Sequence, residues 1–346
     1  MRDAPIPVDR RLSPIVRVAP AKVNLTLAVL GRRTDGYHDL HSVMVPLALS
    51  DRLSVARAHG LADTLRVTGH AAGPDGDNLV VRAISAARVA LRGQVDVWPL
   101  AARLDKIIPV AAGLGGGSSD AAAALDAAFE AWGATTAVDA ARLAEIRTDV
   151  AAGLGSDVPF FLAGGPAVLS GRGDVVTVLP SLRGNPLGLL LVTPSAPALT
   201  RVVFAALDDD VAARPTDSGS TRAASEHLAG EWRAGLPVEK LLIRAGVLAS
   251  ANDLAAAADL VVPGLRSLRR ALVRCLGRPV GLSGSGPTLW VLYASLADAA
   301  AAAEAVSAGV ADGSIAAPGS ARPSIIATTI AAEVHATHRP EEIEPP

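Results

Sequence analysis

A glycine-rich segment at residues 109–119 (Pro-Val-Ala-Ala-Gly-Leu-Gly-Gly-Gly-Ser-Ser) most constrains how this chain can fold. It joins a short apolar stretch, 106–110, to an alanine run that strongly favours a helix. Glycines let backbone N–H groups curl around a ligand, and the start of a helix adds unpaired amides and the positive end of its dipole. The segment therefore predicts an anion-binding loop, most naturally for phosphate. A plain glycine turn before an alanine helix would explain the same residues.

Two common nucleotide-binding motifs do not fit this loop. A Walker A motif requires a lysine directly after its last glycine, and Ser118 follows Gly117 here. The dinucleotide fingerprint would need its third glycine at Ser118 or Asp120. We therefore expect a phosphate loop of another kind, in which Ser118, Ser119 and Asp120 can cap the helix. The predicted loop consists of Pro109, Val110, Ala111, Ala112, Gly113, Leu114, Gly115, Gly116, Gly117, Ser118 and Ser119.

The composition is that of an ordinary globular protein. The 346 residues suffice for two cores, because single cores stop growing at roughly 250–300 residues. A net charge of −2 gives no electrostatic reason to expect a nucleic-acid or membrane partner. No apolar stretch approaches the roughly 18 residues of a membrane span, and the N-terminus lacks a signal core, so we expect a cytoplasmic protein. The single cysteine, Cys275, has apolar neighbours and is expected to be buried.

Lysine is rare in this chain, which makes each one informative. The three lysines are Lys22, which precedes an alternating strand, Lys106, which lies just before the glycine loop, and Lys240. A compact ammonium binds phosphate differently from a planar guanidinium, so a site that needs lysine could not accept arginine. Lys22 and Lys106 are therefore candidate phosphate-site residues, although solvated surface lysines would give the same pattern.

Paired strands with helices between them predict an α+β fold, with no internal repeat. A region rich in Pro, Ser, Asp and Gly, 208–225, is predicted to be a mobile loop with a helix at its far side. Asp77 and Asn78 are expected to cap a helix. The expected strands are 15–31, 42–47, 52–56, 64–68, 95–105, 166–178, 187–193, 278–282, 289–293 and 324–330, and the expected helices are 79–92, the alanine run to 132, 137–150, 263–276 and 295–309.

Three separated motifs resemble the GHMP family of small-molecule kinases. They are 20–25 (Pro-Ala-Lys-Val-Asn-Leu), the glycine loop and 282–288 (Leu-Ser-Gly-Ser-Gly-Pro-Thr), in the family's order. Further segments resemble the branch of the family that phosphorylates cytidine diphosphate-linked methylerythritol in the non-mevalonate route to isoprenoid precursors. These segments are 35–38 (Asp-Gly-Tyr-His), 77–80 (Asp-Asn-Leu-Val), 155–161 (Gly-Ser-Asp-Val-Pro-Phe-Phe) and 252–254 (Asn-Asp-Leu).

The resemblance covers roughly residues 15–330 and implies a two-domain fold. An N-terminal ATP-binding domain is expected at 15–164 and a ferredoxin-like C-terminal substrate domain at 165–334. Tails are expected at 1–14 and 335–346. A kinase for another small alcohol, such as homoserine or mevalonate, and a non-catalytic nucleotide-binding relative are the alternatives.

The resemblance implies that Lys22 and Asp157 are the catalytic pair, and their own chemistry agrees. A kinase must orient and deprotonate an alcohol while charge is neutralised on the transferred phosphoryl group. Asp157 follows Gly155 and Ser156 and precedes an apolar wall, where a partner cation such as Lys22 can tune its charge. An N-cap or turn role is the alternative for Asp157.

Tyr37 and His38 are candidates for recognition of a flat base, because only 3% of the residues are aromatic. Stacking on a nucleobase is worth about 1–3 kcal/mol. The resemblance implies that this pair contacts the cytidine of the substrate, with Asn24 nearby. The resemblance also implies that Thr200 faces the substrate. It further implies that Asn78 and Lys106 approach the nucleotide, as the matching positions in the family do. A turn with Tyr37 packed over the sheet is the alternative.

No His/Cys cluster has the spacing of a zinc site. ATP implies Mg²⁺, held by phosphates and one or two protein oxygens. Ser118 or Ser119 could supply one of these oxygens.

Overall fold

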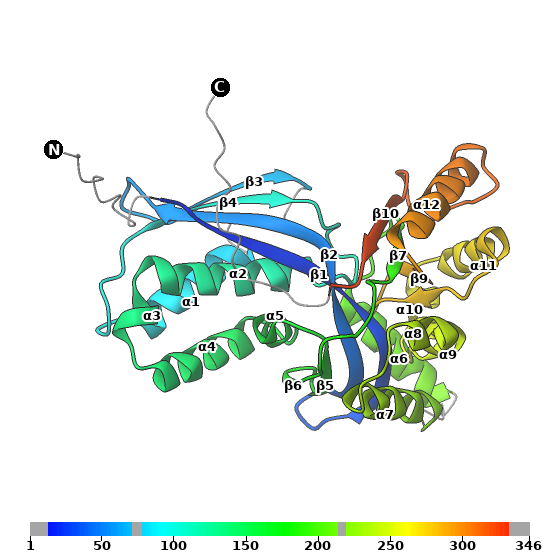
Figure 1. Ribbon diagram of the computed structural model, residues 1–346, viewed down its shortest axis with the longest axis horizontal. Helices are drawn as coiled ribbons and strands as arrows, with labels where there is room; N and C mark the ends of the chain where they lie inside the picture. The colour runs from blue at the N-terminus through cyan, green and yellow to red at the C-terminus, as the bar shows by residue number, and fades with distance from the viewer. Residues whose placement is uncertain (1–12, 71–77, 214–218, 332–346) are drawn as a thin grey trace.

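The computed structural model describes residues 13–70, 78–213 and 219–331 (Figure 1). Most of the expected tails, 1–14 and 335–346, and the expected cap residue Asp77 lie outside the described residues. Asn78 does cap the helix that follows, because its side-chain oxygen accepts a hydrogen bond from the backbone N–H of Val80.

The first sheet is built on a long antiparallel hairpin of β1 (Ile15–Arg32) and β2 (His38–Arg57). The sequence predicted two strands within β2, but continuous pairing with β1 joins them, and the irregularities are absorbed as register shifts instead of a turn. The sheet order is β3-β4-β2-β5-β6, with β1 on the other edge of β2. The remaining strands are β3 (Thr64–Gly69), β4 (Leu100–Lys106), β5 (Ala167–Gly171) and β6 (Val175–Val178).

Helices cover one face of this sheet (Figure 1). The alanine run lets α2 pack closely against both β1 and α1, and its alanines are buried in the first core. Because β3 and β4 are parallel, the chain must cross over between them, and α1 lies in that crossover. The helices of this half are α1 (Leu79–Ala90), α2 (Gly116–Ala131), α3 (Ala134–Ala137), α4 (Ala140–Leu154) and α5 (Val158–Ala163).

The second sheet is antiparallel, with strand order β10-β7-β9-β8. Along the chain, its elements follow the β-α-β-β-α-β pattern of ferredoxin-like folds, which confirms the predicted topology. Its strands are β7 (Gly188–Thr193), β8 (Gly281–Leu282), β9 (Leu289–Tyr293) and β10 (Ser324–Thr329), and its helices are α6 (Thr200–Ala213), α7 (Gly219–Arg233), α8 (Glu239–Ile243), α9 (Ala245–Ser250), α10 (Ala255–Val261), α11 (Leu265–Leu276) and α12 (Leu296–Ala311).

The predicted loop at 208–225 is wrong, because α6 and α7 occupy all of it except 214–218, which lies outside the described residues. The helix expected at its far side is present as α7. Helix α7 buries Thr221, Ser225, Leu228 and Trp232 against the rest of the molecule. The spacing is helical, but two of the five buried positions, which also include Ala229, carry hydroxyls, so the apolar stripe is hard to recognise in the sequence.

The expectation for Cys275 is also wrong, because this residue is exposed near the end of α11. The core-facing stripe of the amphipathic helix is Leu265, Leu268 and Leu272, which leaves the thiol on the solvent side.

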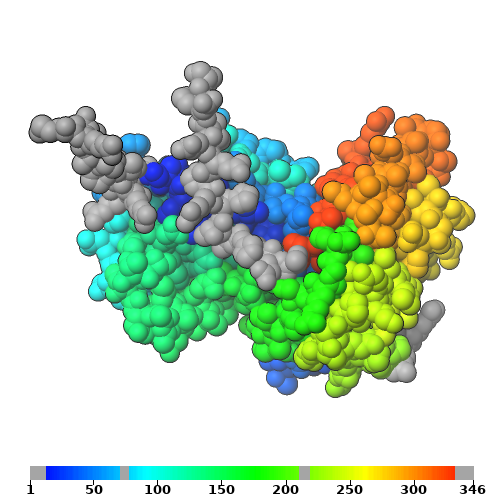
Figure 2. Space-filling model, in the orientation of Figure 1, coloured from blue at the N-terminus to red at the C-terminus, as the bar shows by residue number. Residues whose placement is uncertain are grey.

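The two halves are joined by the long hairpin (Figure 1). Leu27 in β1 bridges to Asn252, and Leu47 in β2 bridges to Ile330. In Figure 2, the cyan and teal atoms of the N-terminal half and the yellow and orange atoms of the C-terminal half lie at opposite ends of the visible face. Among the described helices, none has both the length and the apolar character needed to cross a membrane.

Candidate active site

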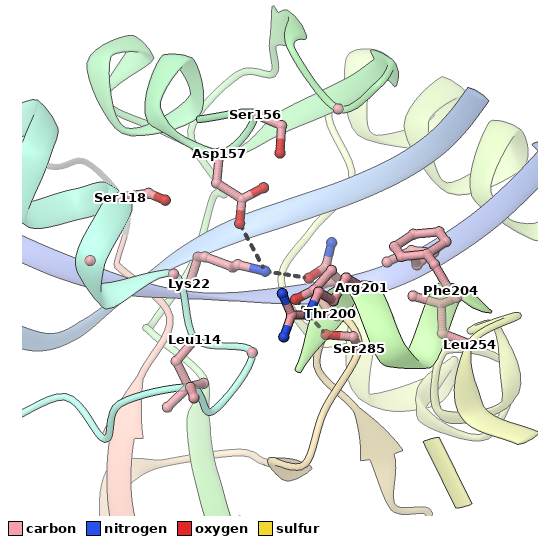
Figure 3. A pocket seen from close by; sticks show the side chains of 18 of the residues that line it. Lys22, Leu114, Ser118, Ser156, Asp157, Thr200, Arg201, Phe204, Leu254 and Ser285 are labelled. Atoms are coloured by element: carbon pink, nitrogen blue, oxygen red, sulfur yellow. Dashed lines mark hydrogen bonds and ion pairs between the residues drawn. The ribbon is translucent and has the colours of Figure 1, made fainter. Parts of the chain in front are cut away.

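A cavity of about 790 Å³ lies where the hairpin, the glycine loop and α6 meet (Figure 3). Apart from Ser119, every site residue predicted from the sequence lines it. Pairs that are far apart in the chain, such as Asn24 with Thr200 and Asn78 with His38, are thereby brought to one place. Such a concave site with convergent polar groups is the usual setting for a small-molecule ligand.

Lys22 and Asp157 form an ion pair in this cavity, as Figure 3 shows. Lys22 Nζ lies 3.5 Å from Asp157 Oδ2 and donates a hydrogen bond of 2.8 Å to Asn24 Oδ1. Register shifts flank Lys22 and Asn24 in β1, and such irregularities re-aim side chains. The Lys22 side chain is only 5% exposed, whereas that of Asp157 is 30% exposed and open to the cavity.

The alternative role of Asp157 as a helix cap is not supported by its hydrogen bonds. Asp157 occupies the N-cap position of α5, but its side chain makes no capping hydrogen bond. The carboxylate is therefore left for the ion pair with Lys22 and for whatever the cavity binds.

The glycine loop ends directly in α2, whose N-cap is Gly115 in the left-handed conformation, with φ of 70°. A Cβ on Gly115 would lie 2.8 Å from the Phe161 ring and 2.9 Å from Lys22 Cγ, so only glycine fits there. The predicted capping by Ser118, Ser119 or Asp120 is wrong, because no side chain caps this helix. Its first amides are consequently not taken by a capping side chain and can serve an anion.

The glycine loop is docked against the 283–288 turn of the second half. Ser283 Oγ donates a hydrogen bond of 2.9 Å to the carbonyl oxygen of Gly113. The N–H of Thr288 donates to the carbonyl oxygen of Ala112 at 3.3 Å. The third motif of the family resemblance, 282–288, therefore holds the glycine loop in place through hydrogen bonds from the second half.

Gly113→Ala should lower the free energy of unfolding by about 2–4 kcal/mol. The new Cβ would overlap the carbonyl oxygen of Ser283 and lie 2.9 Å from that of Gly286, and φ is +76°. Both obstacles are backbone and cannot move aside. Gly117→Ala is the matched control, because its Cβ would meet only Leu79 at 3.6 Å inside a helix. Urea unfolding checks this: equal midpoints for the two variants would contradict the expectation.

Lys106 is buried between two carboxylates. Its Nζ forms an ion pair with Asp51 and a second of 2.8 Å with Asp120. Asp51 also accepts hydrogen bonds from the backbone N–H groups of Ile107 and Ile108. Burial raises the pKa of Asp120 to about 7, because Lys106 only partly offsets it and Asp51 adds a second negative charge. Asp51 was missed because no local pattern links it to the loop.

Asp120→Asn should stabilise the protein at alkaline pH. The folded-state pKa of Asp120 is raised above its usual 3.8, so its contribution to stability is full below that value and is lost as the pH rises through about 7. Asparagine leaves Lys106 with one charged partner at every pH. We expect a gain of about 1–3 kcal/mol at pH 8 and less than half of that gain at pH 5, because the penalty builds up as the pH rises from 3.8 to about 7.

The control for this variant is Asp126→Asn on the same helix, which removes the ion pair of Asp126 with Arg147 and should bring no gain at pH 8. Thermal unfolding at both pH values distinguishes the two variants. A loss of stability in Asp120→Asn at pH 8 would refute the assignment.

The far end of the cavity carries the aromatic residues. His38 stacks on Phe204 with ring centroids 4.8 Å apart, and its Nε2 lies 2.7 Å from Asp208 Oδ1. Tyr37 is 57% exposed, so it is not packed over the sheet, and the Arg172 guanidinium lies 5.0 Å from its ring centre. Sequence reasoning missed Phe204 and Asp208, although their spacing of four on α6 places them on one helix face.

Two family models match this chain: the N-terminal domain of GHMP kinases at residues 78–165 and their C-terminal domain at 239–312. A 4-diphosphocytidyl-2-C-methyl-D-erythritol kinase of Paramagnetospirillum magneticum is 39% identical over 293 residues, which cover 82% of this chain and 91% of that relative. The chain belongs to the GHMP kinase family. A kinase of the same name from Rhizobium meliloti is 35% identical to this GHMP kinase over 300 residues, covering 84% of the chain and 90% of the relative.

Solved structures agree with this assignment. A crystal structure of 4-(cytidine 5'-diphospho)-2C-methyl-D-erythritol kinase superposes on this GHMP kinase with a TM-score of 0.63 and 31% identity, covering 91% of this chain and 99% of that one. A homoserine kinase from Cytophaga hutchinsonii gives a TM-score of 0.64 at 17% identity, with coverages of 96% and 99%. The second likeness shows the fold alone. The predicted α+β fold of GHMP kinases is confirmed, and the chain is an ATP-dependent small-molecule kinase.

Proposed function

We propose that this GHMP kinase transfers the γ-phosphate of ATP to the 2-hydroxyl of 4-diphosphocytidyl-2-C-methyl-D-erythritol, in the cytoplasmic non-mevalonate route to isoprenoid precursors. The ion pair of Lys22 with Asp157 carries this proposal, because it lies in one cavity with the glycine loop and the aromatic pair His38 and Phe204. Two relatives named 4-diphosphocytidyl-2-C-methyl-D-erythritol kinase, which are 39% and 35% identical to this chain, support the choice of substrate.

Asp157 acts as the general base in the proposed reaction. Its carboxylate takes the proton of the substrate hydroxyl as that oxygen bonds to the γ-phosphorus and the bond to the bridging oxygen of ADP breaks. Lys22, 3.5 Å away, keeps the carboxylate oriented and neutralises charge on the transferred group. The amides of the glycine loop bind the remaining phosphate oxygens. Asn24 fixes the ammonium of Lys22 and is itself held by Ser42.

The residues at the loop fit Mg²⁺ held mainly by the nucleotide. Among the described residues, no group of three His, Cys, Asp or Glu side chains could hold a metal alone. Mg²⁺ keeps several waters and takes phosphate oxygens with one or two protein oxygens, so a single hydroxyl suffices. We favour Ser118, which lines the cavity, over Ser119, which is buried and does not. When bound, Mg²⁺ supplies charge stabilisation to the phosphates.

The aromatic end of the cavity favours a nucleobase-bearing substrate. Phe204 and the exposed ring of Tyr37 offer flat faces, and Asp208 orients His38 for hydrogen bonding. Thr200 lies on the same wall, with its hydroxyl 3.1 Å from Ser285 Oγ. Homoserine and mevalonate carry no base and would leave this end empty.

The test is ADP release from Mg-ATP with purified protein and three acceptors offered separately. Turnover is expected with 4-diphosphocytidyl-2-C-methyl-D-erythritol and not with homoserine or mevalonate. Turnover with either small alcohol would contradict the role of the aromatic residues. ATP binding without turnover on any acceptor would identify a non-catalytic relative.

A further inference from the structure

The basic side chains lining the cavity differ in whether they already have a partner. Among the described residues, carboxylates pair with all of them except one, Arg201. The pairs are Lys22 with Asp157, Lys106 with Asp51 and Asp120, Arg32 with Asp208 at 3.7 Å, and Arg172 with Asp174 at 2.8 Å. Arg201 lines the same cavity and has no ion pair or hydrogen bond within the described residues.

Arg201 stands at an electrostatically unfavourable place. It is exposed in the first turn of α6, which carries no acidic residue. The positive end of a helix dipole repels a cation, so this position is favourable only when an anion lies between them. A guanidinium matches the oxygens of a phosphate group in a planar, two-pronged fashion.

One face of α6 connects the aromatic end of the cavity to the catalytic pair. Arg201, Phe204, Ala205 and Asp208 all line the cavity, and their spacing of three, four and seven residues puts them on one helix face. Phe204 and Asp208 hold His38 at the aromatic end.

At its other end, α6 begins beside the catalytic pair. Thr200 bonds to Ser285, and the neighbouring Gly284 is so close that a Cβ there would lie 3.4 Å from Lys22 Nζ. Figure 3 shows Arg201 at this start of the helix, with its side chain directed into the cavity.

We propose that Arg201 binds the diphosphate of the acceptor substrate and thereby selects a nucleoside-diphosphate alcohol over a small alcohol. This inference rests on the function proposed above. Along α6 the order is Phe204, then Arg201, then the pair of Lys22 with Asp157. In the substrate the order is base, diphosphate, then the reacting alcohol. The two orders coincide, which places the diphosphate against the unpaired guanidinium.

Kinetics of Arg201→Gln test this assignment. The KM for 4-diphosphocytidyl-2-C-methyl-D-erythritol should rise by about 10- to 100-fold, with kcat and the KM for ATP within about twofold. Arg201→Lys should restore part of the loss, because it keeps the charge without the fork. Arg142→Gln, which removes an exposed arginine on α4, is the control and should change nothing. A rise in the KM for ATP instead would assign Arg201 to the donor and overturn the proposal.

A binding measurement tests the role of Arg201 without turnover. Calorimetry gives the Kd for cytidine diphosphate and the Kd for cytidine, each with a non-hydrolysable ATP analogue in the donor site. The natural protein should prefer the diphosphate, and Arg201→Gln should bind both alike. An unchanged preference in the variant would overturn the role of Arg201 alone. A natural protein that neither binds cytidine diphosphate nor turns over the acceptor would overturn the proposed function as well.

Discussion

Asp157→Asn is expected to lower kcat by about three orders of magnitude while the Kd for ATP stays within about twofold. An amide cannot take the proton of the substrate hydroxyl, yet it has nearly the same shape. The side chain makes no capping hydrogen bond in α5, so the helix should form normally. Among the described residues its partner is Lys22, and that contact tolerates an amide oxygen. Steady-state ADP release and calorimetric ATP binding measure the two quantities.

The control for Asp157→Asn is Asp139→Asn, which makes the same chemical change at the N-cap of α4. Asparagine caps helices as well as aspartate does, so this variant should keep both stability and turnover. Unchanged turnover in Asp157→Asn would remove Asp157 from its role as base. If Asp157→Asn instead lost both its fold and its ATP binding, Asp157 would have a structural role.

Lys22→Met should lower kcat by about 10²- to 10³-fold, because the charge next to the transferred phosphoryl group is lost. Methionine fills similar apolar space in a buried position, so the fold should survive. Lys22→Arg should lower kcat as well, because Gly115 and Gly284 pack against the lysine side chain too closely for a broader guanidinium.

The control for these variants is Lys240→Met, since Lys240 is exposed on α8 and does not line the cavity. Turnover and unfolding midpoints of the three variants should be measured together. Full activity in Lys22→Arg would show that any cation suffices and would contradict the packing argument.

Much of the fold follows from local sequence patterns. The glycine loop, the alanine helix after it and the order of strands around both were predicted, because backbone freedom and hydrophobic periodicity act over a few neighbouring residues. The prediction failed at 208–225, where buried hydroxyls such as Ser225 interrupt the apolar stripe of α7. Ser225 is buried because it bonds to Thr26 and His41 on the hairpin, which no local pattern reveals.

The residues of the candidate site likewise fall into those that local sequence patterns reveal and those that only tertiary packing reveals. Local sequence patterns were enough to predict the glycine loop and to select Lys22, Asp157, Tyr37 and His38 as candidate site residues, because the motifs are short and because lysine and aromatic residues are rare in this chain. Packing of distant segments, which no local pattern reveals, encloses Lys106 beside Asp51 and leaves Arg201 in the cavity without a counter-ion among the residues that the structure describes. The physical reason is that pairing and burial depend on which distant segments pack together, whereas backbone conformation depends mainly on neighbours in the chain.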